Sequence, residues 1–255
     1  MGKHIAIVDP FPRTLELIFS KDKFKILKSK YELLYAPKNK KIFFYEKNIH
    51  KASFIIGQPD LPKNLLIKAK KLKAIINVES NFINNMDYQY CFKKGIHVIA
   101  TSPVFSKPVA EIALGMTLSL LRNIHTAHLD FIKGKEKYGL ESNLKASLLS
   151  EKKIGLLGFG DLAKSLYPLL LPFTKDINVY DPWIPKIKIK KLGFKNISLN
   201  KMFENCEIIY VLATVTTKNK NFIDKKLLKK MKPNSCFVLM SRAAVVNFND
   251  LINIV

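Results

Sequence analysis

Cysteine is scarce in this sequence of 255 residues, which contains only Cys91, Cys206 and Cys236. The three cysteines lie in separate apolar segments and lack the spacing of metal ligands. This pattern excludes a disulfide framework and gives no indication of a metal site. We therefore expect reduced thiols in a cytoplasmic protein without a bound metal.

Long hydrophobic runs are also absent from the sequence. The apolar stretch Ile112–Leu121 is bounded by Glu111 and Arg122, so it falls short of the roughly 18 to 20 residues that a membrane span needs. The opening segment up to Arg13 is too short and too strand-like for a signal peptide. The sequence thus predicts a globular protein with no membrane partner, built from one large domain or two modest ones.

Arginine is the third scarce residue, because Arg13, Arg122 and Arg242 are the only three and 40 of the 43 basic residues are lysine. The formal net charge of +23 and a pI near 9.8 suggest a nucleic-acid binder, since a basic surface attracts phosphate backbones. The lysines are spread along the whole chain, however, and Lys, Asn, Ile and Phe all have AT-rich codons. Nucleotide bias is therefore the favoured explanation, and a nucleic-acid partner is the alternative.

Short β-branched runs alternate with helix-like stretches from end to end, which is the pattern of parallel α/β folds. Apolar residues at helical spacing after Pro108 predict one long helix from Val109 to about Lys133, which would join two domains. In residues 1–102 we predict a small open α/β domain with a helix over Pro62–Lys70 and strands at His4–Val8, Glu32–Tyr35, Ser53–Ile56, Ala74–Val78 and Val98–Ile99.

Residues 103–255 repeat this alternation and predict a doubly wound parallel sheet. The predicted strands are Lys153–Leu157, Ile177–Asp181, Glu207–Leu212 and Cys236–Met240. The predicted helices are Asp161–Leu171, Asn200–Asn205, Asp224–Met231 and Phe248–Ile252.

The segment from Gly158 to Ala163 reads G-x-G-x-x-A, directly after an apolar strand and at the start of a helical pattern. Gly158 permits the tight turn, Gly160 leaves room for a pyrophosphate, and Ala163 is small enough for close packing of helix on strand. The amides at the helix N-terminus would then hold the phosphates. This order of elements predicts a dinucleotide-binding site.

Asp181 lies 18 residues after Ala163, at the end of the next predicted strand, where the adenosine ribose presents its hydroxyl groups. A carboxylate there favours NAD over NADP, although Lys186 and Lys188 nearby could accommodate a 2′-phosphate. The alternative is that Gly158 and Gly160 form only a strand-to-helix turn and that Asp181 only caps it.

With these motifs the sequence resembles the NAD-dependent D-isomer-specific 2-hydroxyacid dehydrogenases, which include phosphoglycerate, D-lactate and glyoxylate/hydroxypyruvate enzymes. The resemblance spans about Leu72 to Leu251 and implies a flavodoxin-like substrate domain followed by a Rossmann NAD-binding domain. Four segments carry it: Asn77 through Asp87, Pro103 through Glu111, Gly155 through Ala163 with Asp181, and Met231 through Val246.

By this resemblance Arg242 binds the substrate carboxylate and carbonyl, for which a planar, always charged guanidinium is suited. Ser80 and Asn81 correspond to a carboxylate-binding loop that uses backbone amides, although the family usually has glycine at Asn81 and also at Ala243. The residues expected to bind the cofactor are Gly158, Phe159, Gly160, Asp161, Leu162, Ala163, Asp181, Ala213, Thr214 and Arg242.

Hydride transfer to a keto acid needs a proton donor, typically a histidine tuned by a carboxylate, and in the family both follow the arginine. Here the sequence ends at Val255, thirteen residues beyond Arg242, and none of the five histidines matches that position. We therefore expect a C-terminally truncated member that lacks the last strands of its Rossmann sheet and is inactive or feeble alone. The histidines are His4, His50, His97, His125 and His128, of which His125 and His128 are expected to be surface or packing residues.

The leading hypothesis is hydride transfer between NAD(H) and a 2-hydroxy or 2-keto acid, with a homodimer formed through the NAD-binding domains as the resemblance implies. A non-catalytic protein that responds to NAD(H) is the first alternative. A lysine-rich nucleic-acid binder, with steep salt dependence, is the second.

Overall fold

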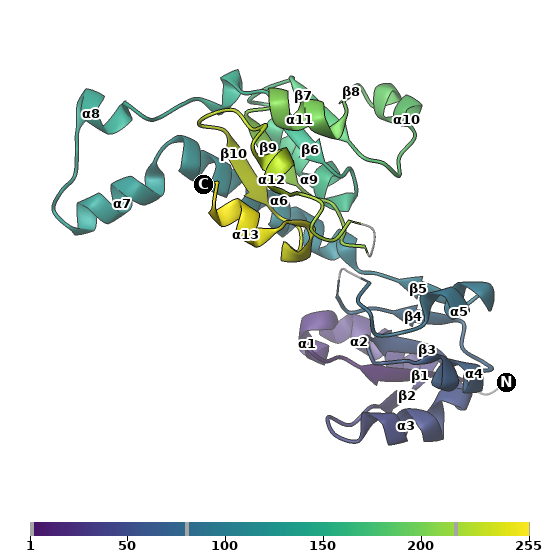
Figure 1. Ribbon diagram of the computed structural model, residues 1–255. Coiled ribbons are helices and arrows are strands. Elements are labelled where there is room, and N and C mark those ends of the chain that lie inside the picture. The colour runs from purple at the N-terminus through teal and green to yellow at the C-terminus, as the bar shows by residue number, and fades with distance from the viewer. Residues whose placement is uncertain (1–2, 80–81, 217–218, 255) are drawn as a thin grey trace. The chain divides into compact units, whose positions relative to one another are not determined.

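The computed structural model describes residues 3–79, 82–216 and 219–254. The chain divides into two compact units, Met1–Val104 and Phe105–Val255, close to the boundary predicted at residue 102. Each unit contains one five-stranded parallel sheet, shown in Figure 1. The predicted α/β class is confirmed.

The first sheet has the strand order β2-β1-β3-β4-β5, which is the flavodoxin-like order. Its strands agree with the predicted ones to within two residues at each end: β1 (His4–Asp9), β2 (Tyr31–Tyr35), β3 (Ala52–Gly57), β4 (Ala74–Ile76) and β5 (His97–Ile99).

Side chains of the first sheet alternate between two apolar layers because successive strand residues point to opposite faces. Ile7 and Ile55 are buried with Tyr45 and the other residues of one layer, whereas Val8 and Ile56 are buried with a second layer that includes Leu27. The helical elements are α1 (Leu15–Ile18), α2 (Lys21–Lys30), α3 (Lys41–Asn48), η1 (Ile49–Lys51), α4 (Lys63–Lys68) and α5 (Tyr88–Lys93).

The second sheet has the order β10-β9-β6-β7-β8, so its chain starts in the middle, runs to one edge and then returns to build the other side. Counted from its first strand, this is the 3-2-1-4-5 order of a Rossmann sheet. The strands are β6 (Ile154–Leu157), β7 (Ile177–Tyr180), β8 (Lys195–Asn196), β9 (Ile208–Val211) and β10 (Cys236–Leu239).

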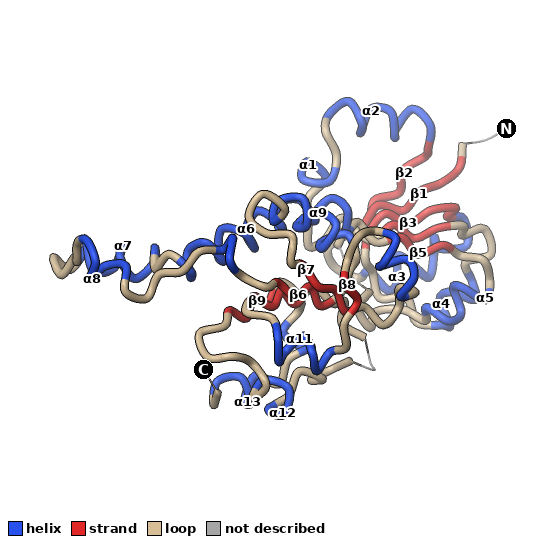
Figure 2. The backbone as a smooth tube through the Cα atoms, turned by 90° about the horizontal axis from the view of Figure 1, so that it is seen from above, coloured by secondary structure: helices blue, strands red, loops and turns tan. Residues whose placement is uncertain are grey.

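Helices cover both faces of the second sheet, as Figure 2 shows with the sheet seen between them. On one face α6 (Ser102–Leu121) and α9 (Asp161–Leu170) pack against Ile154 and Leu156. On the other face α11 (Leu199–Asn205) and α12 (Lys225–Leu228) pack against Leu157 and Ile209. The remaining helical elements are α7 (Ile124–Ile132), α8 (Gly139–Asn143), η2 (Leu149–Glu151), α10 (Lys186–Lys191), η3 (Ala243–Val245) and α13 (Phe248–Ile252).

The predicted single helix from Val109 to Lys133 is wrong at both its start and its middle. Helix α6 begins at Ser102 and contains Pro108 inside it, as its seventh residue. There the proline removes one hydrogen bond of the helix and does not mark the helix start. The helix then ends at Leu121, and Asn123 adopts a left-handed φ of 54° before α7 begins. Asparagine reaches that region more readily than most residues, so it produces the break.

Helix α6 is attached to the sheet through a buried polar contact as well as through apolar packing. Thr117 Oγ1 donates to Ala113 O at 2.8 Å and pairs with Tyr210 Oη of β9 at 2.7 Å. Burial raises the pKa of Tyr210 to about 12. By length and apolar composition alone α6 could cross a membrane. The shorter stretch Ile112–Leu121, considered in the sequence alone, did not indicate this. In the structure Ala110, Ala113 and Leu121 of α6 are buried in the core of this unit.

Helices α7 and α8 form an arm that projects from the body of the second unit (Figure 2). None of the residues in α7 or α8 is buried. Large apolar side chains are nevertheless abundant on the arm, with Phe131 68%, Ile132 66%, Tyr138 75% and Leu140 80% exposed. The arm therefore presents an apolar surface that the unit itself does not cover.

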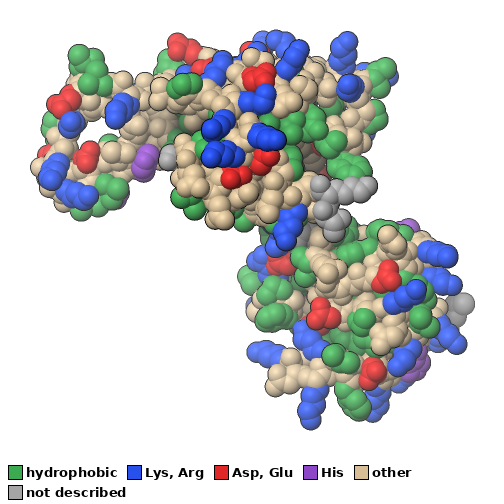
Figure 3. Space-filling view, viewed as in Figure 1, with side chains coloured by type: hydrophobic (Ala, Val, Ile, Leu, Met, Phe, Trp, Pro, Cys, Tyr) green, Lys and Arg blue, Asp and Glu red, His purple; other side chains and the backbone are tan. Residues whose placement is uncertain are grey.

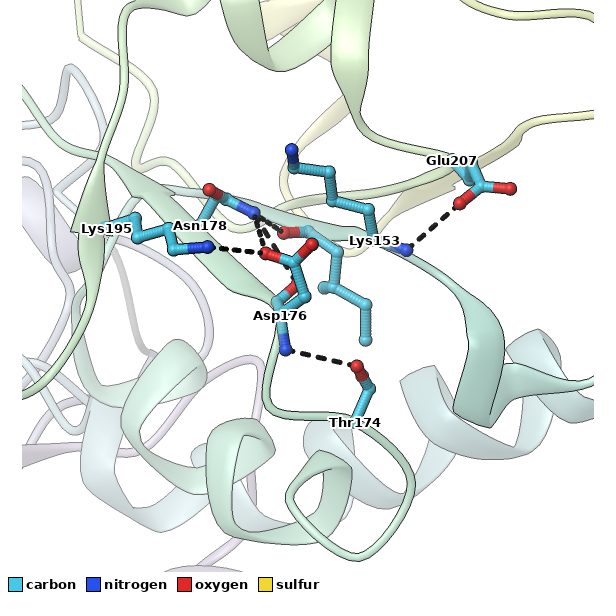
Figure 4. Close-up of polar contacts among 7 residues, drawn as sticks. Lys153, Thr174, Asp176, Asn178, Lys195 and Glu207 are labelled. Atoms are coloured by element: carbon cyan, nitrogen blue, oxygen red, sulfur yellow. Dashed lines mark hydrogen bonds and ion pairs between the residues drawn. The ribbon is translucent and has the colours of Figure 1, made fainter.

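Polar side chains link the strands at the amino-terminal end of the second sheet (Figure 4). Glu207 accepts a hydrogen bond from Lys153 N at 3.1 Å and pairs with Lys152 Nζ at 3.1 Å. Asn178 Nδ2 donates to Ile154 O at 3.3 Å and to Asp176 Oδ1 at 3.2 Å. At this end of the sheet, polar side chains therefore form hydrogen bonds and ion pairs with one another and with the backbone.

Candidate dinucleotide-binding site

The centre of the second sheet, between β6 and β9, is the point where the strand order reverses. In open α/β sheets, ligands bind at such a point, beyond the carboxyl ends of the strands. Here Gly158 is the first residue after β6, and Ala213 is the second residue after β9. The site is built outward from these two residues.

Gly158 brings three chain segments together at the reversal point. Its amide donates to Tyr180 O, at the end of β7, at 2.8 Å. Its φ is +94°, and a Cβ atom placed on it would lie 2.9 Å from both the Cα and the N of Ala213. A side chain is therefore excluded by the left-handed backbone and by the neighbouring strand end.

Gly160 precedes the ten-residue helix α9 as its N-cap. Unlike Gly158, it has no heavy atom within 4 Å of the position that a Cβ would occupy, so the space beside it is open. The amides of the first helical turn lack partners within the helix and attract anions. Open space beside such amides fits a pyrophosphate that approaches the backbone.

Ala163, one turn into α9, is fully buried in the core shared with the sheet, consistent with its predicted packing role. Phe159 is buried in that core and Leu162 packs partly against it, so Phe159 can meet a cofactor only through its backbone. Asp161 lies in the first turn of α9 with Lys164 Nζ at 3.8 Å from its carboxylate.

Asp181 accepts three backbone hydrogen bonds. Its Oδ2 accepts from Phe159 N at 2.8 Å, and its Oδ1 accepts from Trp183 N at 2.8 Å and Ile184 N at 3.2 Å. A carboxylate has about four acceptor positions, so Oδ2 retains capacity for a ribose hydroxyl. Asp181 thus ties the glycine-rich loop to the loop after β7, which is the capping role that the sequence offered as the alternative to a place beside the ribose.

A pocket of about 330 Å³ opens at the carboxyl ends of β6, β7 and β9. Of the residues expected to bind the cofactor, Gly158, Gly160, Asp181, Ala213 and Thr214 line it. The pocket also has walls that were not predicted from the sequence: Leu157, Tyr180, Pro182, Trp183, Leu212, Thr216, Asn219 and Phe222.

Trp183 is the most prominent of the unpredicted wall residues because its side chain is 73% exposed. It directly follows Asp181 and Pro182, so its position beside that carboxylate was visible in the sequence. Asn219 had no such signal. Its Oδ1 accepts from Thr216 N at 2.6 Å and its Nδ2 donates to Thr214 O at 2.8 Å, and these contacts form only once the loop after β9 is folded.

Arg242 follows β10, at the same end of the sheet as the pocket, but does not line it. The preceding residue, Ser241, donates a short hydrogen bond from Oγ to Ala213 O, which ties this segment to the loop after β9. Arg242 is exposed and its guanidinium forms no ion pair within the described parts of the chain. Its charge is therefore available to an anionic group.

The predicted substrate loop at Ser80 and Asn81 lies outside the described residues. Its neighbour Glu79 pairs with Arg13 Nε at 2.7 Å. The histidines His125 and His128 are exposed on α7, and His125 Nε2 lies 3.1 Å from Thr126 Oγ1 of the same helix.

Comparison with known families gives a match over more than half of the chain. The model of the NAD binding domain of D-isomer specific 2-hydroxyacid dehydrogenases matches residues 114–255.

Two curated relatives match most of this chain but extend well beyond it. Hydroxypyruvate reductase of Thermotoga maritima is 28% identical over 182 residues, which are 71% of this chain and 58% of that protein. D-3-phosphoglycerate dehydrogenase of Methanocaldococcus jannaschii is 26% identical over 186 residues, 72% of this chain and 35% of that protein.

Solved structures share the fold over nearly the whole chain. A phosphoglycerate oxidoreductase from Rhizobium etli is 39% identical with a TM-score of 0.80, and the match covers 98% of this chain and 76% of that one. A D-lactate dehydrogenase from Aquifex aeolicus, complexed with NAD and lactic acid, is 22% identical with a TM-score of 0.72, covering 98% and 72%.

Proposed function

Since the chain belongs to the family of D-isomer specific 2-hydroxyacid dehydrogenases, we propose that it takes part in hydride transfer between NAD(H) and a 2-hydroxy or 2-keto acid. The observation that carries this proposal is the pocket at the reversal point of the second sheet, which combines Gly158, Gly160 and Asp181. The bound nicotinamide cofactor supplies or accepts the hydride. The chain's own residues bind and orient the two reactants.

The proposed cofactor contacts follow from the open space and the donors at the site. The pyrophosphate lies beside Gly160, where no atom occupies the Cβ position, and accepts hydrogen bonds from the first turn of α9. A ribose hydroxyl donates to Asp181 Oδ2, which accepts one backbone hydrogen bond where Oδ1 accepts two.

A preference for NADH over NADPH follows from the charge of Asp181. A 2′-phosphate would place a second anion beside this carboxylate, and like charges at a few ångströms repel. Lys186 could offset that repulsion only from the far side of Asp181, because it lines an adjacent pocket with Asp181 and Trp183 and not the pocket beside Gly160.

For the acid substrate we propose Arg242 as the group that binds the carboxylate. Its exposure and the absence of an ion pair among the described residues support this assignment, since a guanidinium binds a carboxylate through two parallel hydrogen bonds. Ser80 and Asn81 remain the proposed second contact, on the resemblance alone.

A proton donor for the developing alkoxide is not assigned among the histidines of this sequence, all of which precede Gly158. The chain also spans 58% of one curated relative and 35% of the other. Because no histidine of this sequence is assigned as the proton donor, we propose that these 255 residues bind NADH and the acid and turn over slowly.

The role of Arg242 can be tested without turnover, through binding of oxalate to the chain saturated with NADH. Replacing the charge in Arg242→Gln is expected to weaken oxalate binding at least about 30-fold, since a charge-assisted pair contributes roughly 2 to 3 kcal/mol. Arg122→Gln is the matched control, because Arg122 is also exposed, and should change binding less than about twofold. Equal effects of the two variants would contradict the assignment.

We also propose that a second copy of the chain covers the arm formed by α7 and α8, giving a homodimer through the NAD-binding units. The exposed Phe131 and Leu140 support this, because apolar side chains gathered on one surface usually mark an interaction site. In sedimentation experiments Phe131→Glu with Leu140→Glu should shift a dimer to monomer. Phe43→Glu, at a residue 67% exposed in α3, should leave the assembly unchanged, and a monomer in the unaltered protein would refute the proposal.

A further inference from the structure

The amino-terminal end of the first sheet carries a pocket of about 600 Å³. Residues that enter or precede β1, β3 and β4 meet there, because these three strands are neighbours in a parallel sheet. We call it the lysine pocket, and its lining residues are Lys3, His4, Ile5, Lys51, Ser53, Lys70, Lys71, Leu72 and Lys73.

The lysine pocket has five lysines and no carboxylate among its lining residues. None of these lysines forms an ion pair within residues 3–79, 82–216 and 219–254. Glu32 pairs in register with Ile5 on the adjacent strand but does not line the pocket. In Figure 3, side chains in the shared colour of Lys and Arg lie along the edge of the first unit where Figure 1 shows β1 beginning, and along its other edges too.

Lysine abundance alone does not account for this arrangement, because other pockets of the same chain mix both signs of charge. The pocket on the arm has Lys137 and Lys145 together with Asp130, Glu136 and Glu141. Elsewhere single lysines lie against carboxylates, as Lys41 does with Asp9 at 2.6 Å. Five like charges around one concavity instead create a positive field that an anion would relieve.

We propose that the lysine pocket binds a small molecule through an oligophosphate group, meaning two or more linked phosphates. A volume of about 600 Å³ is within the usual range for small-ligand sites. An oligophosphate carries several negative charges in a compact group and so meets several ammonium groups at once, whereas a single phosphate engages fewer of them.

The polar wall of the pocket suits such a ligand. Ser53 is 5% exposed, and its Oγ lies 3.1 Å from His4 Nδ1. This pair places hydrogen-bonding groups beneath the lysines without adding a negative charge. A phosphate oxygen can therefore be met by both charge and hydrogen bonds.

A nucleic acid fits this pocket less well than a small molecule does. Sequence-independent binding of single strands uses exposed aromatic rings on which bases stack. The aromatic ring beside the pocket, Phe54, already makes edge contacts with His4 at 6.3 Å and Tyr31 at 5.5 Å between ring centroids. The pocket also lies at the opposite end of the sheet from Glu79, which follows β4, so the inference does not depend on the proposed function.

Calorimetric titration of the full chain with sodium tripolyphosphate in about 0.1 M KCl tests the proposal, and lysine variants assign the binding to the pocket. One saturable site is expected, with orthophosphate binding at least tenfold more weakly. Lys70→Gln combined with Lys71→Gln and Lys73→Gln should weaken tripolyphosphate binding at least tenfold. The matched control removes the same charge from α2, through Lys21→Gln, Lys23→Gln and Lys25→Gln, and should change binding less than twofold.

Circular dichroism melting of both triple variants distinguishes a lost site from a lost fold. If the triple variant of the pocket fails to fold, the single variant Lys71→Gln replaces it and should show a partial loss of tripolyphosphate binding. Equal weakening in the two triple variants would show nonspecific charge attraction and overturn the proposal. So would the absence of saturable binding. The proposal would also be overturned, in favour of a nucleic acid, if the chain bound a 20-base-pair DNA duplex through the pocket lysines but did not bind tripolyphosphate.

Discussion

Strand β7 has an aspartate at each end, and the two are held in different ways. Asp176, before the strand, is 3.2 Å from Asn178 Nδ2 and 3.5 Å from Lys195 Nζ, so side chains of its own unit contact its carboxylate. Asp181, after the strand, accepts hydrogen bonds only from backbone amides among the described residues and borders a pocket. The same residue type closes the sheet at one end and leaves acceptor capacity for a ligand at the other.

The same difference extends across the sheet. At the amino-terminal end Glu207 binds both Lys152 and the backbone of Lys153. At the carboxyl end two small residues, Gly158 directly after β6 and Ala213 two residues after β9, approach each other closely. Side-chain networks stabilise one end, while small residues and backbone amides at the other end leave room for a cofactor.

Gly160→Ala should give the largest effect on cofactor binding. The new methyl group would enter space that is open in the protein and that the pyrophosphate is proposed to occupy, so we expect NADH affinity to fall about 30- to 100-fold, or roughly 2 to 3 kcal/mol. Fluorescence titration measures this. Gly115→Ala in α6, where a methyl group also meets no atom within 4 Å, should bind NADH normally; if it does not, the comparison of the two ends fails.

Asp181→Asn should have the next largest effect, reducing NADH affinity about 10- to 30-fold and narrowing the preference over NADPH. An amide has only one acceptor oxygen, so it cannot satisfy the backbone donors on both sides and a ribose hydroxyl as well. Asp176→Asn, at the other end of β7, should leave both affinities unchanged. A thermal melt of each variant separates loss of the site from loss of the fold.

Trp183→Ala should weaken NADH binding by a smaller factor, about three- to tenfold, because it removes one exposed wall of the pocket that can contact an adenine ring. Tyr138→Ala is the matched control on the arm, with an aromatic side chain 75% exposed. The NADH affinities of the two variants are compared by competition of unlabelled NADH against labelled NADH, a measurement that needs no tryptophan. An unchanged affinity in Trp183→Ala would remove Trp183 from the site.

Glu207→Gln should lower the free energy of unfolding by about 1 to 2 kcal/mol and leave NADH affinity unchanged. Burial alone would raise the pKa of Glu207, but hydrogen bonds from Lys153 N and Lys152 lower that pKa overall from its ordinary value of 4.5. A lowered folded-state pKa means that the stabilisation is complete above the unfolded value and is lost as the pH falls through the folded value. Urea denaturation measures the free energy of unfolding of the unaltered protein and of Glu207→Gln. The difference between the two proteins should therefore be smaller at pH 4 than at pH 7.

Much of the second unit could be predicted from the sequence because local signals agreed there. The apolar strands, Gly158, Gly160 and Asp181 follow one another with fixed spacing. The four predicted strands begin and end within a residue of β6, β7, β9 and β10, whereas the two-residue strand β8 was not predicted. The pocket walls Thr216 and Asn219 could not be predicted, because their positions depend on hydrogen bonds within a folded loop. The break at Asn123 was missed because the helical apolar spacing continues past a single residue in a left-handed conformation.

In the first unit the sequence indicated the strands but not the lysine pocket. Lys3, Lys51 and Lys73 are far apart along the chain and come together only because β1, β3 and β4 are neighbours in the sheet. The even spread of lysines along the sequence therefore does not describe their distribution in space.

The most direct test of the central claim is titration of the unaltered chain with NADH, followed by energy transfer from Trp183, the only tryptophan, to the bound nicotinamide ring, with NADPH as the comparison. The account predicts saturable binding of NADH with an affinity at least about tenfold higher than that of NADPH, and loss of the signal in Gly160→Ala. Folded protein that binds neither nucleotide, or that prefers NADPH, would contradict it.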